Sequence, residues 1–73
     1  MSERLIRQWG IVREIRGRWV LASDLADRFG VCRRTISRDL DVLSLVFPVE
    51  ELKGHRNMVA FYLPRHLGIL EVE

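Results

Sequence analysis

Cysteine and long apolar runs are scarce in this 73-residue chain, and each scarcity excludes a class of protein. The single cysteine, Cys32, rules out an intrachain disulfide framework and a zinc site built from cysteines, and it is in keeping with a reducing cytoplasm. No apolar run approaches the length of a membrane span. We expect no signal peptide, because Arg4 and Arg7 follow the first residues at once, and therefore a cytoplasmic protein without membrane contact.

The motifs of enzymes are also lacking. There is no nucleophile elbow, no phosphate-cradling loop and no paired carboxylate pattern. The two histidines, His55 and His66, have no metal-ligand spacing with an acid or a cysteine. We therefore expect no enzymatic activity, no metal and no cofactor, and we expect Trp9 and Trp19 to serve as core aromatics.

The chain does contain enough apolar residues, 48% of the total, to build the core of one small domain. Its charge is unevenly distributed: residues 1–38 carry nine arginines against four acids, whereas residues 39–73 carry three basic residues against six acids. Lys53 is the only lysine among the twelve basic residues. Arginine has a planar fork that suits phosphates and guanine edges. An arginine preference in a GC-rich genome would give the same bias.

Apolar spacing predicts a first helix that begins after a Ser2 cap and ends at Gly17. Its buried stripe is predicted from residues spaced four, three and three apart, namely Leu5, Trp9, Val12 and Ile15. Gly10 lies inside this helix, where either a close packing neighbour or simple tolerance accounts for it. The segment 18–21 that follows is either an extended connector or a one-bridge strand.

Two further helices are predicted. A short one follows a Ser23 cap and buries Leu25, Ala26 and Phe29 before a turn at Gly30. A longer one starts near Arg33, with Cys32 as its capping residue, and runs to Leu45, where Phe47 and Pro48 stop it. Its inward positions are spaced i, i+4 and i+7: Ile36, Leu40 and Leu43.

After Pro48 the apolar period changes to that of strands. Residues 49–53 and 58–63 are candidate strands, and residues 54–57 between them are rich in hairpin formers. The order of elements predicts a mainly α fold with a small β-hairpin, a winged helix-turn-helix of three helices plus a wing. It spans residues 1–63, and residues 64–73 are a tail or the start of a linker to a further domain.

The helix-turn-helix is the most specific part of this pattern. Ala26 supplies a small residue at the helix crossing, and Gly30 supplies a turn residue that tolerates positive φ. Val31, Ile36 and Leu40 are placed to lock the second helix of the motif onto the first. A chance match in a small helical protein is the alternative.

The outward face of the third helix points to DNA. Arg34 and Arg38 lie opposite its apolar side, and a recognition helix reads bases with its N-terminal half. The predicted DNA-binding residues are Ser23, Arg33, Arg34, Thr35, Ser37 and Arg38, with Lys53, His55 and Arg56 in the hairpin turn. Alternatively, Arg34 or Arg38 pairs with Asp39 or Asp41 on a solvated face, and the hairpin turn is an ordinary polar turn. We also expect both aspartates to orient the arginines.

Glu50 and Glu51 would repel phosphate, so their strand must face away from DNA or lie at a dimer contact.

Four segments resemble a known family: Arg7-Gln8-Trp9 with Ile11-Val12, Leu25-Ala26-Asp27-Arg28-Phe29-Gly30-Val31, Arg34-Thr35-Ile36-Ser37-Arg38-Asp39-Leu40, and Phe47-Pro48-Val49. They are similar to the N-terminal domain of WYL-domain transcriptional regulators, which are related to the DeoR-like winged-helix proteins. The resemblance covers about residues 4–63, and the run from Arg34 to Leu40 is its most specific part. The family usually has Ser at position 32, where Cys32 caps poorly, and Gly at position 46, where Val46 disfavours a left-handed helix end.

The resemblance implies a bacterial transcription regulator that binds double-stranded DNA as a homodimer in the nucleoid. It also implies a C-terminal WYL domain that senses an effector ligand and that lies beyond this chain. The alternative is a winged-helix module for protein–protein interaction or dimerisation without DNA binding. The acidic second half of the chain would suit a basic partner of such a module.

Overall fold

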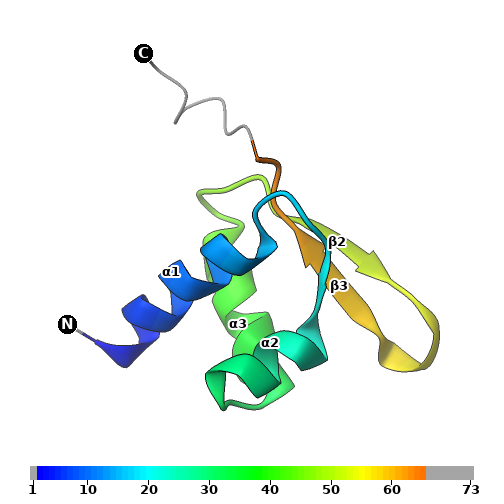
Figure 1. Cartoon of the computed structure of the whole chain (residues 1–73), viewed down its shortest axis with the longest axis horizontal. Helices are drawn as coiled ribbons and strands as arrows, with labels where there is room; N and C mark the ends of the chain where they lie inside the picture. The colour runs from blue at the N-terminus through cyan, green and yellow to red at the C-terminus, as the bar shows by residue number, and fades with distance from the viewer. Residues whose placement is uncertain (1, 66–73) are drawn as a thin grey trace.

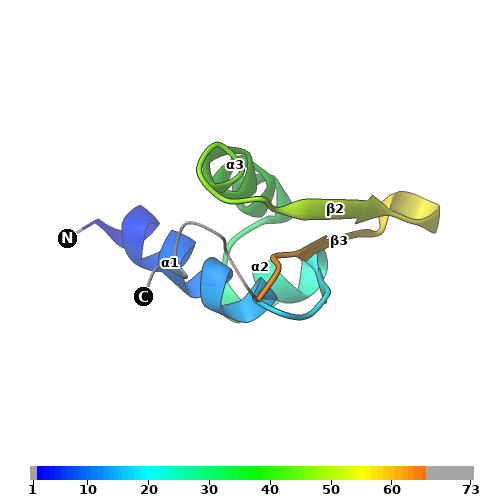
Figure 2. The same ribbon diagram turned by 90° about the horizontal axis from the view of Figure 1, so that it is seen from above.

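The chain folds into three helices and a small antiparallel sheet, which confirms the predicted winged helix-turn-helix layout (Figure 1). The structure, a computed structural model, describes residues 2–65, so most of the predicted tail 64–73 lies outside the described residues. The elements are α1 (Glu3–Ile15), β1 (Val20–Leu21), α2 (Ala22–Phe29), α3 (Arg33–Leu43), β2 (Glu50–Lys53), the 3₁₀ turn η1 (His55–Asn57) and β3 (Val59–Tyr62). The β2–β3 hairpin projects away from the N-terminal end of α1 (Figures 1 and 2).

The sheet has the strand order β1-β3-β2, with both pairings antiparallel. Phe61 of β3 is opposite Val20 of β1 on one side and Glu51 of β2 on the other. The segment after α1 is therefore a short strand, and it adds a third strand to the predicted hairpin. The sheet ties the wing to the start of the helix-turn-helix, because β1 runs directly into α2.

The core lies between the helices and the inner face of β3. Eleven apolar side chains are buried there: Ile11, Val12, Ile15, Ala22, Leu25, Ala26, Ile36, Leu40, Leu43, Phe61 and Leu63. The inward positions predicted for the second and third helices are confirmed, except that Phe29 is only partly buried.

The predicted stripe of the first helix is wrong in its N-terminal half. Leu5 and Trp9 are 43% and 57% exposed, and Ile11 is fully buried in their place. Trp19 is also exposed, at 47%, and stacks on Tyr62 with ring centroids 5.1 Å apart. Both tryptophans are therefore surface residues and not the expected core aromatics. The core closes around the C-terminal half of α1, and Trp9 meets only the edge of the fold, where its ring centroid lies 6.4 Å from that of Phe47.

The helix caps confirm one prediction and correct another. Ser2 caps α1, since its Oγ accepts a hydrogen bond from the Leu5 backbone N–H at 3.1 Å. Ser23 does not cap α2: the N-cap is Leu21, and Ser23 already lies in the first turn. The reason is that Leu21 is held in an extended conformation by its pairing with Ala60 of β3, so the helix begins directly where the strand ends.

The third helix ends at Leu43, two residues before the predicted Leu45. The chain after it is held by three-residue hydrogen bonds from the Leu45 N–H to the Val42 carbonyl at 3.1 Å and from the Val46 N–H to the Leu43 carbonyl at 3.0 Å. Val46 has no positive φ, so this end lacks the left-handed residue that a glycine would provide. A β-branched side chain is disfavoured in that conformation, and the chain leaves the helix through a tighter turn instead.

Two glycines determine how α2 packs on α1 and where α2 ends. A Cβ at Gly10 would lie 2.7 Å from Cε1 of Phe29, so the close packing neighbour predicted as one option is present. Gly30 has φ of +67° and donates its N–H to the Ala26 carbonyl, which ends α2 and starts the turn of the motif.

Candidate nucleic-acid interface

The inner side of helix α3 is buried, and its outer side is exposed to solvent. Ile36, Leu40 and Leu43 are buried against the rest of the fold. The outer side presents the predicted DNA-binding residues: Arg33, Arg34, Ser37 and Arg38 are exposed, and Thr35 is half-buried. The buried residues hold the helix in place, and these five outward side chains are called the ridge below.

The arginines of this ridge form no ion pair within residues 2–65. The ion pairs found there join Arg7 to Asp39 and join both Arg18 and Arg28 to Glu14. The predicted alternative, in which Arg34 or Arg38 pairs with Asp39 or Asp41, is therefore wrong for the described part of the chain. Three guanidinium groups remain available to an external anion.

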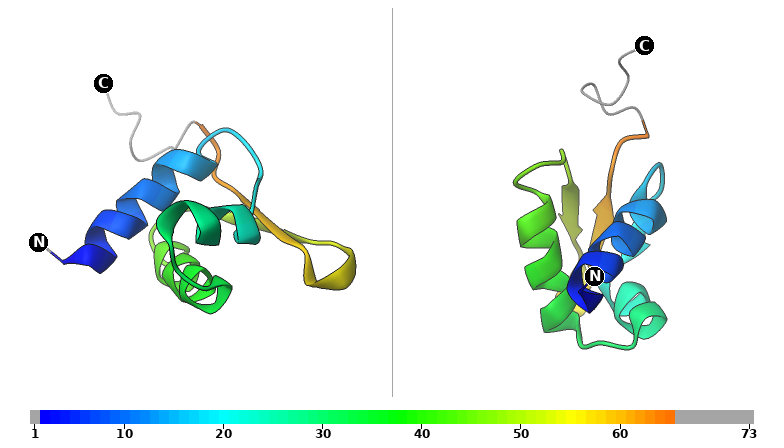
Figure 3. Two further views of the ribbon diagram at one scale, coloured as in Figure 1. Left: turned by 60° about the horizontal axis from the view of Figure 1, so that its bottom comes forward. Right: turned by 90° about the vertical axis from the view of Figure 1, so that its left-hand side faces the viewer.

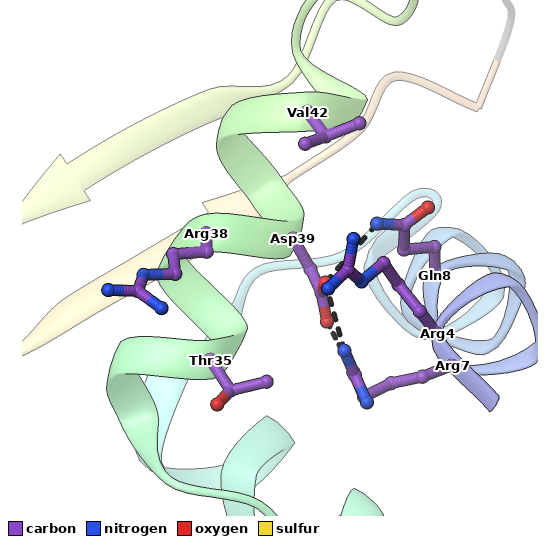
Figure 4. A pocket seen from close by; sticks show the side chains of 7 residues that line it. All are labelled: Arg4, Arg7, Gln8, Thr35, Arg38, Asp39 and Val42. Carbon is purple, nitrogen blue, oxygen red and sulfur yellow. Dashed lines mark hydrogen bonds and ion pairs between the residues drawn. The ribbon is translucent and has the colours of Figure 1, made fainter.

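Asp39 has a different role from the one predicted, because it does not orient the ridge arginines. It is buried and faces α1 (Figure 4). Its carboxylate accepts hydrogen bonds from Nε and Nη2 of Arg7, the second at 3.1 Å, and from Nε2 of Gln8 at 3.2 Å. The hydrogen bond to Asp39 raises the pKa of Arg7 above its ordinary value. Asp39 thus joins α3 to α1, and its negative charge is neutralised.

A hollow flanks the ridge on each side. The hollow toward α1 measures about 210 Å³ and is lined by Arg4, Arg7, Gln8, Thr35, Arg38, Asp39 and Val42 (Figure 4). The hollow toward the wing measures about 200 Å³ and is lined by Ala22, Arg33, Arg34, Ser37, Asn57 and Val59. The structure thus divides the five α3 residues between two flanks: Thr35 and Arg38 on one, and Arg33, Arg34 and Ser37 on the other.

The wing tip carries the remaining predicted contacts. Lys53, His55 and Arg56 are exposed and line neither hollow. The turn is closed by a hydrogen bond from the Gly54 N–H to the Met58 carbonyl at 2.7 Å. Arg56 has φ of +57°, which costs an arginine about 1–2 kcal/mol. The tip projects well beyond the helices (Figure 3).

Three other polar residues complete the comparison with the sequence predictions. Ser23 is exposed in the first turn of α2, next in sequence to Ala22 of the wing-side hollow. Glu50 and Glu51 are both exposed on β2. The structure therefore keeps these acids on the strand and off the helix ridge.

Cys32 occupies the N-cap of α3, but its side chain makes no capping hydrogen bond. Its Sγ lies 3.4 Å from Oγ1 of Thr35. This hydrogen bond lowers the pKa of the Cys32 thiol from its ordinary value. The absent cap agrees with the weak capping expected of cysteine.

Sequence reasoning missed Arg4 and Asn57. Arg4 is one of several charged residues off the apolar stripe of α1, and only the packing of α1 on α3 brings it to the same hollow as Thr35 and Arg38. Asn57 did carry a signal, since asparagine tolerates the left-handed conformation that it adopts here, with φ of +63°.

No family model, curated protein or solved structure matches the chain. The resemblance to WYL-domain regulators therefore stays a prediction. Among the residues that the structure describes, no helix is long and apolar enough to cross a membrane. No group of three or more His, Cys, Asp or Glu side chains within residues 2–65 is arranged to hold a metal ion.

Proposed function

We propose that this protein binds double-stranded DNA, with α3 in the major groove and the wing beside it at the backbone or minor groove. One observation carries the proposal: Arg33, Arg34 and Arg38 form an exposed ridge on a fixed helix with no acid paired to them within residues 2–65. Unpaired arginines on a rigid helix are the groups that duplex DNA requires, because they contact both phosphates and guanine.

The predicted DNA-binding residues have two kinds of role in this proposal: some contact bases and the others contact the DNA backbone. Arg34 and Arg38 donate to base edges, and a bidentate pair of this kind discriminates against a wrong base by about 1–3 kcal/mol. Arg33, Thr35 and Ser37 contact phosphates that set the position of the helix. Ser23 contacts the backbone from the start of α2. Lys53, His55 and Arg56 reach the neighbouring backbone or minor groove from the wing.

The wider assignment rests on the resemblance. It makes the protein a sequence-specific transcriptional regulator in the bacterial nucleoid, acting as a homodimer on paired half-sites. An effector ligand would bind a further C-terminal domain. No catalytic step and no cofactor enter this function.

Selection of bound duplexes from a random pool tests the proposal and yields a target duplex. Arg34→Ala and Arg38→Ala should each weaken binding to that duplex by at least tenfold while the circular dichroism spectrum stays unchanged. Arg13→Ala is the matched control, because Arg13 is an exposed arginine of α1 without an ion pair in the described residues. Binding by both ridge variants at the level of the wild type would contradict the assignment of α3.

A second candidate function is a protein-interaction module, and one observation favours it. An apolar hollow between α1 and the end of α3 is lined by Leu5, Gln8, Trp9, Val42, Leu43, Val46 and Phe47. Trp9 and Val46 are both more than half exposed there. Absence of any DNA complex at low salt, together with a stable complex with a basic partner protein, would favour this function over DNA binding.

A further inference from the structure

We propose that Arg4, with Thr35 beside it, forms a phosphate seat in the hollow between α1 and α3, which holds one backbone phosphate of the bound duplex while Arg38, at the edge of the hollow, stays available to bases. This inference rests on the proposed function and adds a second element, α1, to the DNA-binding surface. The ligand is a phosphodiester of the strand that borders the recognition helix on its α1 side.

The hollow between α1 and α3 has an excess of positive charge. Three arginines line it, namely Arg4, Arg7 and Arg38, and Asp39 is its only acid. The carboxylate of Asp39 is occupied by Arg7 and Gln8. Arg4 and Arg38 are both exposed and pair with no acid in residues 2–65, so the hollow keeps two uncompensated positive charges.

The fixed pair of Arg7 and Asp39 gives the seat a rigid wall. Arg7 is 17% exposed and Asp39 is 4% exposed, so neither is free to turn toward DNA. Thr35 adds a hydroxyl donor at the rim, although its Oγ1 also contacts Cys32. The guanidinium group of Arg4 suits the tetrahedral oxygens of a phosphate, which accept several hydrogen bonds at once. Arg38 points away from Arg4 in Figure 4 and adds positive charge at the edge of the hollow.

The position of the hollow identifies the phosphate as one of the DNA backbone. An α-helix with its side chains is about 10–12 Å across, and the major groove is about 12 Å wide. A helix in the groove therefore has a backbone strand along each flank. The α1-side hollow and the wing-side hollow lie on these two flanks, and both are lined by arginines of α3.

The volume of the hollow is compatible with this ligand. The hollow measures about 210 Å³, and one water molecule occupies about 30 Å³ in the liquid, so there is room for several waters. A phosphate can enter with part of its hydration shell. No backbone movement is needed for this contact, since Arg4 is an exposed side chain of α1.

The test compares Arg4→Gln with Arg13→Gln on the selected duplex and on an unrelated duplex. Arg13 lies nine positions further along α1, on the opposite side of the helix at 100° per residue, so the two variants remove the same charge from opposite faces. Fluorescence anisotropy gives the dissociation constant between 50 and 200 mM salt. Circular dichroism and thermal melting check the fold of each variant.

We expect Arg4→Gln to weaken binding to both duplexes by the same factor, because a phosphate contact carries no sequence information. Its salt slope should be shallower than that of the wild type by about 0.9, so the advantage of the wild type shrinks about threefold to fourfold between 50 and 200 mM salt. Arg13→Gln should keep the wild-type slope. In ethylation interference, the variant should lose one phosphate position that the wild type requires.

A wild-type slope and an unchanged interference pattern for Arg4→Gln would overturn the seat, while duplex binding by the wild type would leave the proposed function intact. Equal losses in Arg4→Gln and Arg13→Gln would also overturn it, because they would report net charge and not a site. If the wild type binds no duplex at low salt, both proposals fall together.

Discussion

Replacement of Asp39 by alanine should destabilise the domain severely, although Asp39 lies on the helix that is proposed to read DNA. The substitution removes a carboxylate that accepts three hydrogen bonds from Arg7 and Gln8. It leaves the guanidinium of Arg7 in a site that is only 17% exposed, without its counter-charge. Loss of one partner of a buried ion pair costs about 3–5 kcal/mol.

The partial exposure of Arg7 lowers this figure, because the released side chain can reach water. We expect about 2–3 kcal/mol for Asp39→Ala, in agreement with about 1.5–3 kcal/mol for a hydrogen bond to a charged group. A domain of this length has about 4–11 kcal/mol of total stability. The melting temperature should therefore fall by about 10–20 °C.

Urea unfolding followed by circular dichroism measures the effect, and a double-mutant cycle of Arg7→Gln and Asp39→Asn isolates the pair. The coupling free energy should be about 1.5–3 kcal/mol and should change little in 1 M salt, since the pair is shielded from solvent. Arg18→Ala is the control, because Arg18 is 65% exposed in its pair with Glu14 and should cost no more than about 1 kcal/mol. A coupling below about 0.5 kcal/mol would refute the reasoning.

Three further outcomes are expected. The lowered thiol pKa of Cys32 gives it more thiolate at pH 7, so it should react with iodoacetamide faster than an unperturbed cysteine. Thr35→Val should slow this reaction, because it removes the hydrogen bond to the thiol. Equal rates in Thr35→Val and the wild type would exclude this hydrogen bond as the cause. Arg56→Gly should raise the free energy of unfolding by about 0.5 kcal/mol, because glycine adopts the positive φ of this position freely. The same variant should bind DNA more weakly. A stabilised variant with full affinity would exclude the wing tip from the interface. Asp41→Asn should strengthen binding to every duplex by about fivefold, because it removes about 1 kcal/mol of repulsion between Asp41 and the phosphates. Asp41→Glu keeps the charge and should not change the affinity. Equal affinities of Asp41→Asn and the wild type would place Asp41 away from DNA.

Local signals in the sequence were sufficient for much of this fold. The period of Ile36, Leu40 and Leu43 predicted the buried side of α3, and Gly30 predicted the turn. Ser2 predicted the start of α1. Each of these features depends on residues within a few positions of one another, where helix geometry fixes the spacing.

The predictions that failed depend on contacts between distant parts of the chain. Ser23 looked like a cap, but pairing of Leu21 with β3 sets the start of α2. Trp9 fits the apolar stripe of α1, but it lies at the rim of an open hollow beside Phe47 and stays 57% exposed. No spacing rule could have joined Asp39 to Arg7, which lies 32 positions earlier in the chain.

The placement of the two acids of α3 explains how a helix that carries both charges is compatible with the proposed DNA binding. Asp39 and Asp41 follow the arginines directly, and exposure of both would put negative charge beside the phosphates. The fold buries Asp39 against Arg7, which removes its charge from the outer face and leaves Arg38 unpaired. Asp41 stays exposed and marks the end of the usable surface. In the proposed function, contact with DNA is therefore confined to the first two turns of α3, and the ion pair of Arg7 with Asp39 that joins α3 to α1 also leaves those turns net positive.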